Sequence, residues 1–170
     1  DGTIIDYKGM VPASAKSALR EASKNGHKLI VCTGCSECEI DGRNMDIDFD
    51  GIIGGNGCYV RMKDEVIFHK PLTEEQCTHF VNWCNRRDLA FRLECNSGMY
   101  LSEGYEEKSR IARAKYAYGS EWEGKQPPAL TPWMKQGNLC RNDVNKTAFV
   151  LHSYQDYLDA KKEFSDLVVD

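Results

Sequence analysis

Two kinds of residue that could do chemistry occur together in the stretch LIVCTGCSEC. Cys32, Cys35 and Cys38 recur at every third residue, and C-x-x-C-x-x-C is one way in which a chain presents thiolates to zinc or to an iron–sulfur cluster. Thr33 and Gly34 follow directly on an apolar run. A hydroxyl and an unhindered backbone N–H at the end of a strand suit a phosphate oxygen. The stretch therefore indicates either a metal site or a phosphate-binding turn.

The metal hypothesis is the less favoured of the two. The bacterial cluster motif needs a fourth cysteine followed by proline, and Gly42 and Arg43 occupy those places. Cys32 closes a predicted strand, while Cys35 and Cys38 follow the turn. Bringing all three sulfurs to one ion would distort the strand end, so a Cys-ligated metal protein stays only as an alternative.

The segments around this stretch indicate an α/β fold. The first 70 residues contain a helical pattern in VPASAKSALREASKNG, apolar runs in KLIVC and FDGIIGGNG, and a hairpin pattern in CYVRM and EVIFH. KLIVC has the composition of a strand that is buried on both faces. The alternation predicts a parallel sheet with helices on both faces, and such sheets bind ligands at the carboxyl ends of their strands.

A different pattern begins at Pro71. Thr73 and Gln76 form a capping box before an amphipathic helix, LAFRLEC alternates like a strand with one wet face, and GMYLSEG can pair with it. The final LVVD has the pattern of a starting strand. We therefore predict a boundary near residue 71, with a second, more open α+β unit over residues 71–170.

Composition excludes some classes of partner. The net charge of −4 argues against a non-specific binder of nucleic acid or of anionic membranes. No segment approaches the roughly 18 apolar residues of a membrane span. Eight cysteines without an export signal favour reduced thiols, and so a cytoplasmic protein.

Three short motifs occur in a fixed order along the first 57 residues. Asp1, Gly2 and Thr3 open the chain, a Thr-Gly pair follows the next predicted strand, and an Asn-Gly pair follows the one after it. In this order and spacing the chain resembles the haloacid dehalogenase superfamily of phosphohydrolases, in its Cof-type branch with a large α/β cap. The resemblance implies a Rossmann-like parallel-sheet core, present in part over residues 1–70, and an inserted, incomplete α+β cap over 71–170.

The resemblance also implies a function for each motif. The chain would belong to a Mg²⁺-dependent phosphohydrolase that acts on a small phosphorylated metabolite through an aspartyl-phosphate intermediate. Asp1 would be the catalytic acid and base, and its backbone carbonyl would ligate Mg²⁺. Thr33 and Gly34 would hold the phosphoryl group. Asn56 and Gly57 would bind the substrate.

The chain departs from the family pattern in several places. The nucleophilic aspartate is expected two positions before Asp1, and the family's lysine and its second acidic motif are expected after the cap. Lys146 is not a convincing substitute for that lysine, because it begins an apolar strand of the cap pattern. Cys35 stands where this branch usually has arginine. We expect the 170 residues to be part of a longer chain and to be inactive alone. A catalytically silent phosphate-binding module is the main alternative.

Overall fold

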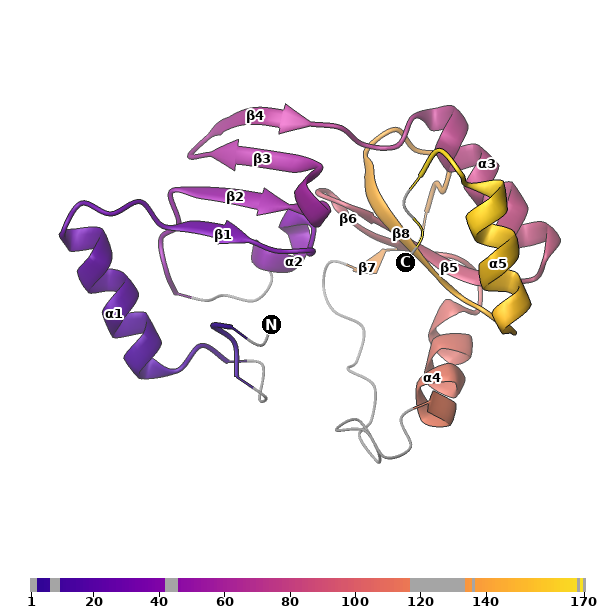
Figure 1. Cartoon of the computed structure of the whole chain (residues 1–170), viewed down its shortest axis with the longest axis horizontal. Coiled ribbons are helices and arrows are strands. Elements are labelled where there is room, and N and C mark those ends of the chain that lie inside the picture. The colour runs from indigo at the N-terminus through magenta and orange to yellow at the C-terminus, as the bar shows by residue number, and fades with distance from the viewer. Residues whose placement is uncertain are drawn as a thin grey trace.

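The computed structural model contains two four-stranded sheets that lie beside one another, each with its own helices (Figure 1). It describes residues 3–6, 10–41, 46–116, 134–135, 137–167 and 169. Asp1 and Gly2, two of the residues of the opening motif, lie outside the described residues.

The first sheet is built from the N-terminal elements. Its strands, in spatial order, are β1 (Ile30–Cys32), β2 (Gly51–Gly54), β3 (Tyr59–Met62) and β4 (Glu65–His69). The helices of this region are α1 (Ala13–Lys24), α2 (Glu37–Asp41) and the 3-10 turn η1 (Gly55–Gly57). β1 and β2 are parallel, as predicted, and the predicted hairpin β3–β4 continues the sheet in antiparallel register. The carboxyl ends of β1 and β2 therefore meet at one edge of the sheet.

One expectation about this sheet was wrong. The sequence pattern predicts that β1 is buried on both faces, but Ile30 is 46% exposed and Cys32 is exposed. The physical reason is that β1 is the edge strand of the described sheet, with β2 as its partner. An apolar sequence indicates that a strand can be buried on both faces. At the edge of a sheet, however, no neighbouring strand covers one side, and part of the apolar surface stays exposed.

The second sheet follows Pro71 and has the strand order β7-β6-β5-β8. Its strands are β5 (Ala90–Cys95), β6 (Gly98–Leu101), β7 (Met134–Lys135) and β8 (Val144–Val150), and its helices are α3 (Glu74–Arg86), α4 (Tyr105–Tyr116) and α5 (Tyr154–Glu163). The predicted capping box is present at the start of α3, where Thr73 and Gln76 bond reciprocally. The expected C-terminal strand is not seen at Leu167 and Val169, and the rest of LVVD lies outside the described residues.

A continuous apolar core joins α3 and α5 to one face of the second sheet. Its centre is a set of aromatic side chains in edge-to-face and tilted contact, namely Phe80, Trp83, Phe91, Phe149 and Phe164. Phe91 is completely buried. Such contacts add to the stabilisation that comes from burial alone.

The opposite face of β5 is charged but is not exposed to solvent as predicted. Arg92 and Glu94 alternate with the core residues, yet Glu94 is only 1% exposed. It is buried because cations from β5 and β8 neutralise it, and a paired charge can be buried where a single one cannot. This charged stripe lies on the face of the sheet away from α3 and α5.

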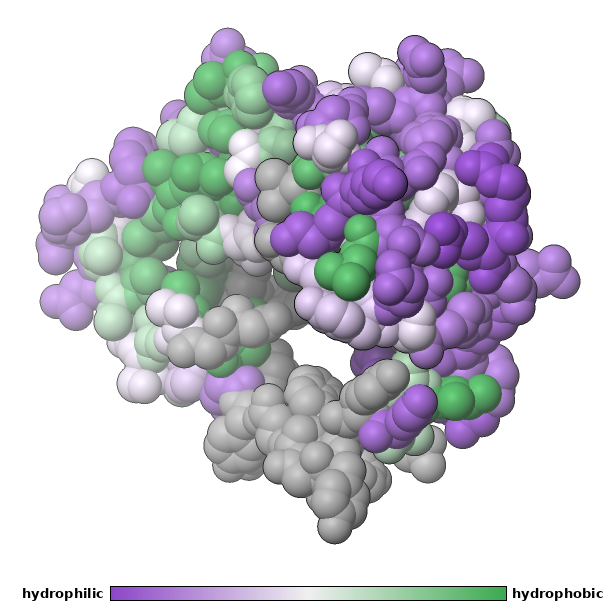
Figure 2. Space-filling view, turned by 45° about the vertical axis from the view of Figure 1, so that its right-hand side comes forward, coloured by the Kyte–Doolittle hydropathy of each residue, from purple (hydrophilic) through white to green (hydrophobic). Residues whose placement is uncertain are grey.

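The surface differs between the two regions (Figure 2). Hydrophobic side chains gather over the first sheet, where Val66, Ile67 and Phe68 of β4 are 51%, 59% and 47% exposed. The outer side of the helices on the second sheet is mostly hydrophilic. Of the helices that the structure describes, none is long and apolar enough to cross a membrane.

Candidate functional site

The predicted phosphate-binding turn lies at the carboxyl end of β1. The N–H of Thr33 donates to the carbonyl of Ile53 on β2 (2.9 Å), and its Oγ1 accepts from the N–H of Cys35 (3.2 Å). The carbonyl of Cys35 accepts from Gly55 N (2.9 Å), which fixes the turn against the glycine loop. Because the oxygen of Thr33 is used as an acceptor, its O–H remains available to donate to an anion.

Gly34 and Asn56 come together at this turn. A Cβ atom at Gly34 would lie 2.6 Å from Asn56 Oδ1, so the close approach of the amide requires glycine here. Asn56 itself adopts a left-handed conformation, with φ of 57°. Among the described residues, none accepts the backbone N–H of Gly34. The turn therefore presents a hydroxyl, a backbone N–H and a side-chain amide in one place.

The start of β8 lies against the first sheet at the same point. Asn145, which is 8% exposed, donates from Nδ2 to Ser36 Oγ (3.0 Å) and to Asn96 Oδ1 (2.7 Å), while its Oδ1 accepts from His69 Nε2 (2.9 Å). A Cβ atom at Gly55 would lie 2.9 Å from that of Asn145. Four segments that are far apart in the sequence are therefore tied together beside the turn.

Helix α2, which follows the turn, is held by its own polar contacts. Glu37 accepts from the hydroxyl of Tyr59 (2.7 Å) and forms an ion pair with Arg61 of β3 (2.5 Å). Burial and the Glu37 carboxylate raise the pKa of Tyr59 to about 12, so its hydroxyl remains a hydrogen-bond donor at neutral pH. The short helix therefore has a fixed position relative to the sheet.

A group of charges from the second sheet faces this region. Lys146 Nζ lies 2.8 Å from Glu94 Oε2, and Arg92 Nε donates to Glu94 Oε1 (2.8 Å). Lys146 Nζ also lies 3.9 Å from the position of a Cβ at Gly34. Burial and the nearby Glu94 raise the pKa of Glu39 on α2. Both sheets therefore contribute charged groups to the surroundings of the turn.

The sequence-predicted residues have different outcomes. The structure brings Thr33, Gly34 and Asn56 together, whereas Gly57 is exposed at the far end of the loop with φ of +91° and makes no close approach. Asp1 lies outside the described residues. The roles of all these residues in binding and catalysis remain predictions.

Sequence reasoning did not identify the contribution of the second sheet. Lys146 is on strand β8, as expected, but its ammonium reaches the turn of the first sheet. Glu94, Arg92 and Asn145 were not singled out either. No local pattern marks them, because their position depends on how two sheets pack together.

The cysteine-metal alternative finds no support at the turn. Within the part of the chain that the structure describes, no group of three or more His, Cys, Asp or Glu residues could hold a metal ion. Cys38 instead donates from its sulfur to the carbonyl of Cys95 (3.1 Å). Asp1, the Mg²⁺ ligand that the resemblance implies, lies outside the described residues.

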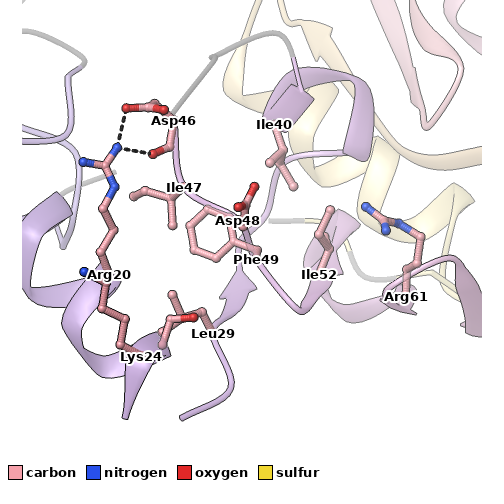
Figure 3. Close-up of a pocket in the computed structure, with 11 residues that line it drawn as sticks. Arg20, Lys24, Leu29, Ile40, Asp46, Ile47, Asp48, Phe49, Ile52 and Arg61 are labelled. Atoms are coloured by element: carbon pink, nitrogen blue, oxygen red, sulfur yellow. Dashed lines mark hydrogen bonds and ion pairs between the residues drawn. The ribbon is translucent and has the colours of Figure 1, made fainter. Parts of the chain in front are cut away.

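A hollow on the first sheet lies at a different place from the turn (Figure 3). It has a volume of about 750 Å³ and lies between α1, α2 and the segment before β2, with the Arg20–Asp46 ion pair (2.5 Å) on its rim. Leu29, Ile40 and Ile52 line its apolar side. None of the residues of the turn lines this hollow, so it is separate from the candidate site.

Comparison with known sequences gives a consistent picture. Residues 1–167 match the sequence model of the haloacid dehalogenase-like hydrolases. YkrA of Bacillus subtilis (strain 168), a provisionally named phosphatase, is 28% identical over 74 residues, which are 44% of this chain and 29% of YkrA.

Solved structures share the fold over almost the whole chain. A protein from Geobacillus kaustophilus HTA426 has a TM-score of 0.71 at 17% identity, over 95% of this chain and 60% of that one. A haloacid dehalogenase-like hydrolase from B. subtilis has a TM-score of 0.66 at 16% identity, over 97% and 64%. BT4131, a sugar phosphatase of subclass IIB, has a TM-score of 0.64 at 17% identity, over 97% and 61%. The present chain spans about three fifths of the length of these structures.

Proposed function

Because the chain belongs to the haloacid dehalogenase-like hydrolases, we propose that the full-length protein is a phosphatase of small phosphorylated metabolites. The observation that carries this proposal is the turn of Thr33 and Gly34 at the carboxyl end of β1, with the Asn56 amide against it. That edge is where sheets of this kind bind their ligands. The sugar phosphatase BT4131, which shares the fold, supports a sugar phosphate or a similar small ester as the substrate class.

In the proposed reaction the turn positions the phosphoryl group. The O–H of Thr33 and the N–H of Gly34 would donate to two phosphoryl oxygens, and the Asn56 amide would restrict where the group lies. Phosphoryl transfer depends mostly on positioning and on stabilising charge. An aspartate two positions before Asp1 would be the nucleophile, and it would form an aspartyl-phosphate. Asp1 would protonate the leaving oxygen and then activate water.

We further assign the family's metal and cap to this protein. The backbone carbonyl of Asp1 would be one ligand of a Mg²⁺ ion, and the ion would supply positive charge beside the phosphoryl group. Residues 1–70 would be part of the core domain and residues 71–170 part of the cap, which would contribute specificity for the leaving group and exclude water.

None of the eight cysteines, all within the described residues, forms a disulfide, which supports a reducing cytoplasmic location.

Thr33→Val in the full-length protein tests the role of the turn. Valine has the same shape but no hydroxyl, so we expect kcat/KM for phosphate esters to fall about a hundredfold, a loss typical of removing one donor to a developing charge. Turnover would be measured by phosphate release over a panel of sugar phosphates and other esters, with Mg²⁺ and with EDTA.

Thr78→Val on α3 is the matched control, since it removes a hydroxyl from the second region. Thr33→Ser should recover most of the activity. A full-length wild-type protein that hydrolyses no ester but still binds inorganic phosphate would favour the silent phosphate-binding module. Equal activity of Thr33→Val and wild type would remove the turn from the mechanism.

A further inference from the structure

Lys146 brings a positive charge from the second sheet to the turn of the first. Its ammonium lies 3.9 Å from the position of a Cβ at Gly34, next to the Asn56 amide. The turn itself contains no cation, since residues 33–36 are Thr, Gly, Cys and Ser. A dianionic phosphate at the turn would therefore meet neutral donors from the first sheet and a charged donor from β8.

Glu94 fixes the position of this lysine. The two residues are directly opposite each other on β5 and β8, and Nζ lies 2.8 Å from Oε2. Glu94 is 1% exposed, and its Oε2 has no aligned hydrogen-bond donor among the described residues, although Oε1 accepts from Arg92. Opposite charges this close attract each other strongly in a buried place, so the ammonium of Lys146 is held beside Glu94. An ammonium has three N–H donors, so the contact with Glu94 leaves others for an anion at the turn.

The register of β8 against the first sheet is also fixed beside Lys146. Its neighbour in the sequence, Asn145, bonds to Ser36 and His69 of the first region, as well as to Asn96. Ser36 is fully buried and lies two residues after Gly34. The position of the ammonium over the turn is therefore determined by contacts on both sides.

From this arrangement we propose that Lys146 contacts a phosphoryl oxygen of the phosphate bound at the turn of Thr33 and Gly34, and that Glu94 is the residue that positions it. The proposal rests on the proposed function, because it takes the turn as the phosphate site. It assigns a phosphate-binding residue to the second sheet, which would otherwise contact only the leaving group. The lysine would complete the phosphate site only when the two sheets are in contact as observed.

Binding of inorganic phosphate to the full-length protein, measured by calorimetry at constant ionic strength, tests the proposal. We expect Lys146→Met to raise Kd about tenfold, the loss of one charge-assisted hydrogen bond at a partly exposed site. Lys146→Arg should retain most of the affinity. Lys162→Met on α5 removes the same charge far from the turn, and its Kd should stay within about twofold of wild type.

Lys146→Met leaves Glu94 with Arg92 as its one cationic partner among the described residues and could disturb folding, so the double variant Lys146→Met/Glu94→Gln is made beside it. Gln has the shape of Glu but no charge, and the double variant should fold and still bind phosphate about tenfold more weakly. A Kd of the folded double variant within twofold of wild type would overturn the proposal. So would a loss no larger than that of Lys162→Met, or a wild-type protein that does not bind phosphate.

The leaving group separates this contact from an ordinary specificity contact. A contact with the phosphoryl group predicts that Lys146→Met lowers kcat/KM by a similar factor for every ester. A loss confined to esters with an anionic leaving group would contradict it. If phosphate binding depends on Lys146 but the protein hydrolyses no ester, the proposed function is contradicted and this inference is not. If the protein hydrolyses esters at a rate that does not depend on Lys146, this inference is contradicted and the proposed function is not.

Discussion

The two sheets differ in how they bury apolar surface. The second sheet has a continuous core, in which Cys77, Phe91 and Leu93 are completely buried between β5 and the helices. The first sheet exposes apolar side chains at both of its edges, with Ile30 on β1 and Ile67 on β4 (Figure 2). Most of the stability of this chain should therefore come from the second region, since burial of apolar area is the dominant favourable term in folding.

The candidate site lies where the two regions meet, and it uses what each provides. The first sheet supplies the turn with its hydroxyl and backbone donors, which depend on local hydrogen bonds. The second sheet supplies Lys146 and Glu94, whose positions depend on a rigid strand pair. The region with the larger buried core therefore positions charged groups for the region with the smaller one.

Phe91→Ala and Phe68→Ala form the most direct test of this difference. The same atoms are removed in both, but Phe91 is fully buried in the second region and Phe68 is 47% exposed on β4. We expect Phe91→Ala to lower the free energy of unfolding by about 3–5 kcal/mol, and Phe68→Ala by less than about 1 kcal/mol. Urea unfolding of the full-length protein measures both. Similar losses would show that the first sheet is as well packed as the second.

Local patterns predicted most of the elements of the fold. The capping box of α3, the hairpin β3–β4 and the pairing of β5 with β6 are present as predicted. These features depend on residues close in sequence, so the sequence is sufficient to indicate them. The burial of β1 and of Glu94 was mispredicted, because burial depends on which elements pack alongside.

The candidate site was predictable only in part. The family resemblance implied phosphate binding by Thr33 and Gly34 and substrate binding by Asn56 and Gly57. The structure brings Thr33, Gly34 and Asn56 together, and the roles themselves stay predictions. Lys146 is more than a hundred residues away in the chain. Its position follows from the packing of two sheets, and that packing is not encoded in the pattern of any short segment.

Gly55→Ala tests the contact that joins the two regions. Gly55 has φ of +56°, and an added Cβ would lie 2.8 Å from Cys58 Sγ and 2.9 Å from Asn145 Cβ. The start of β8 would have to move away from the glycine loop. Gly55→Ala should therefore lower the free energy of unfolding by about 2–3 kcal/mol, because the left-handed backbone and the overpacking both disfavour the added methyl group.

Gly57→Ala separates the two contributions. Gly57 also has a positive φ, of +91°, but an added Cβ would meet nothing within 4 Å. Gly57→Ala should therefore lower the free energy of unfolding only by the cost of a left-handed backbone, about 1–2 kcal/mol. Thermal and urea unfolding of both variants measure the difference. If the two losses are equal, the packing of Asn145 on the loop adds nothing, and the regions are joined elsewhere.

Glu39→Gln is expected to have the smallest effect, and the opposite sign. Burial, and then the nearby Glu94, raise the pKa of Glu39, so the ionised carboxylate disfavours the folded state. This loss of folding stability is absent at pH values below the ordinary pKa of glutamate. It grows as the pH rises from that value through the raised pKa of Glu39. Gln cannot ionise, and its side-chain carbonyl can still accept from Ser36 N, as Glu39 does (3.0 Å). We therefore expect the variant to be more stable at pH 7, by less than about 1 kcal/mol because solvent screens a half-buried charge.

The pH dependence is the decisive part of that measurement. The gain of Glu39→Gln should disappear when urea unfolding is repeated near pH 4, where wild-type Glu39 is protonated in the folded state and the repulsion from Glu94 across the two regions is removed. Glu65→Gln, at an exposed position of the hairpin, is the control and should leave stability unchanged at both pH values. A gain that persists at low pH would mean that Gln packs better than Glu at this position. A gain seen only at neutral pH would mean that repulsion between carboxylates opposes the contact between the two sheets.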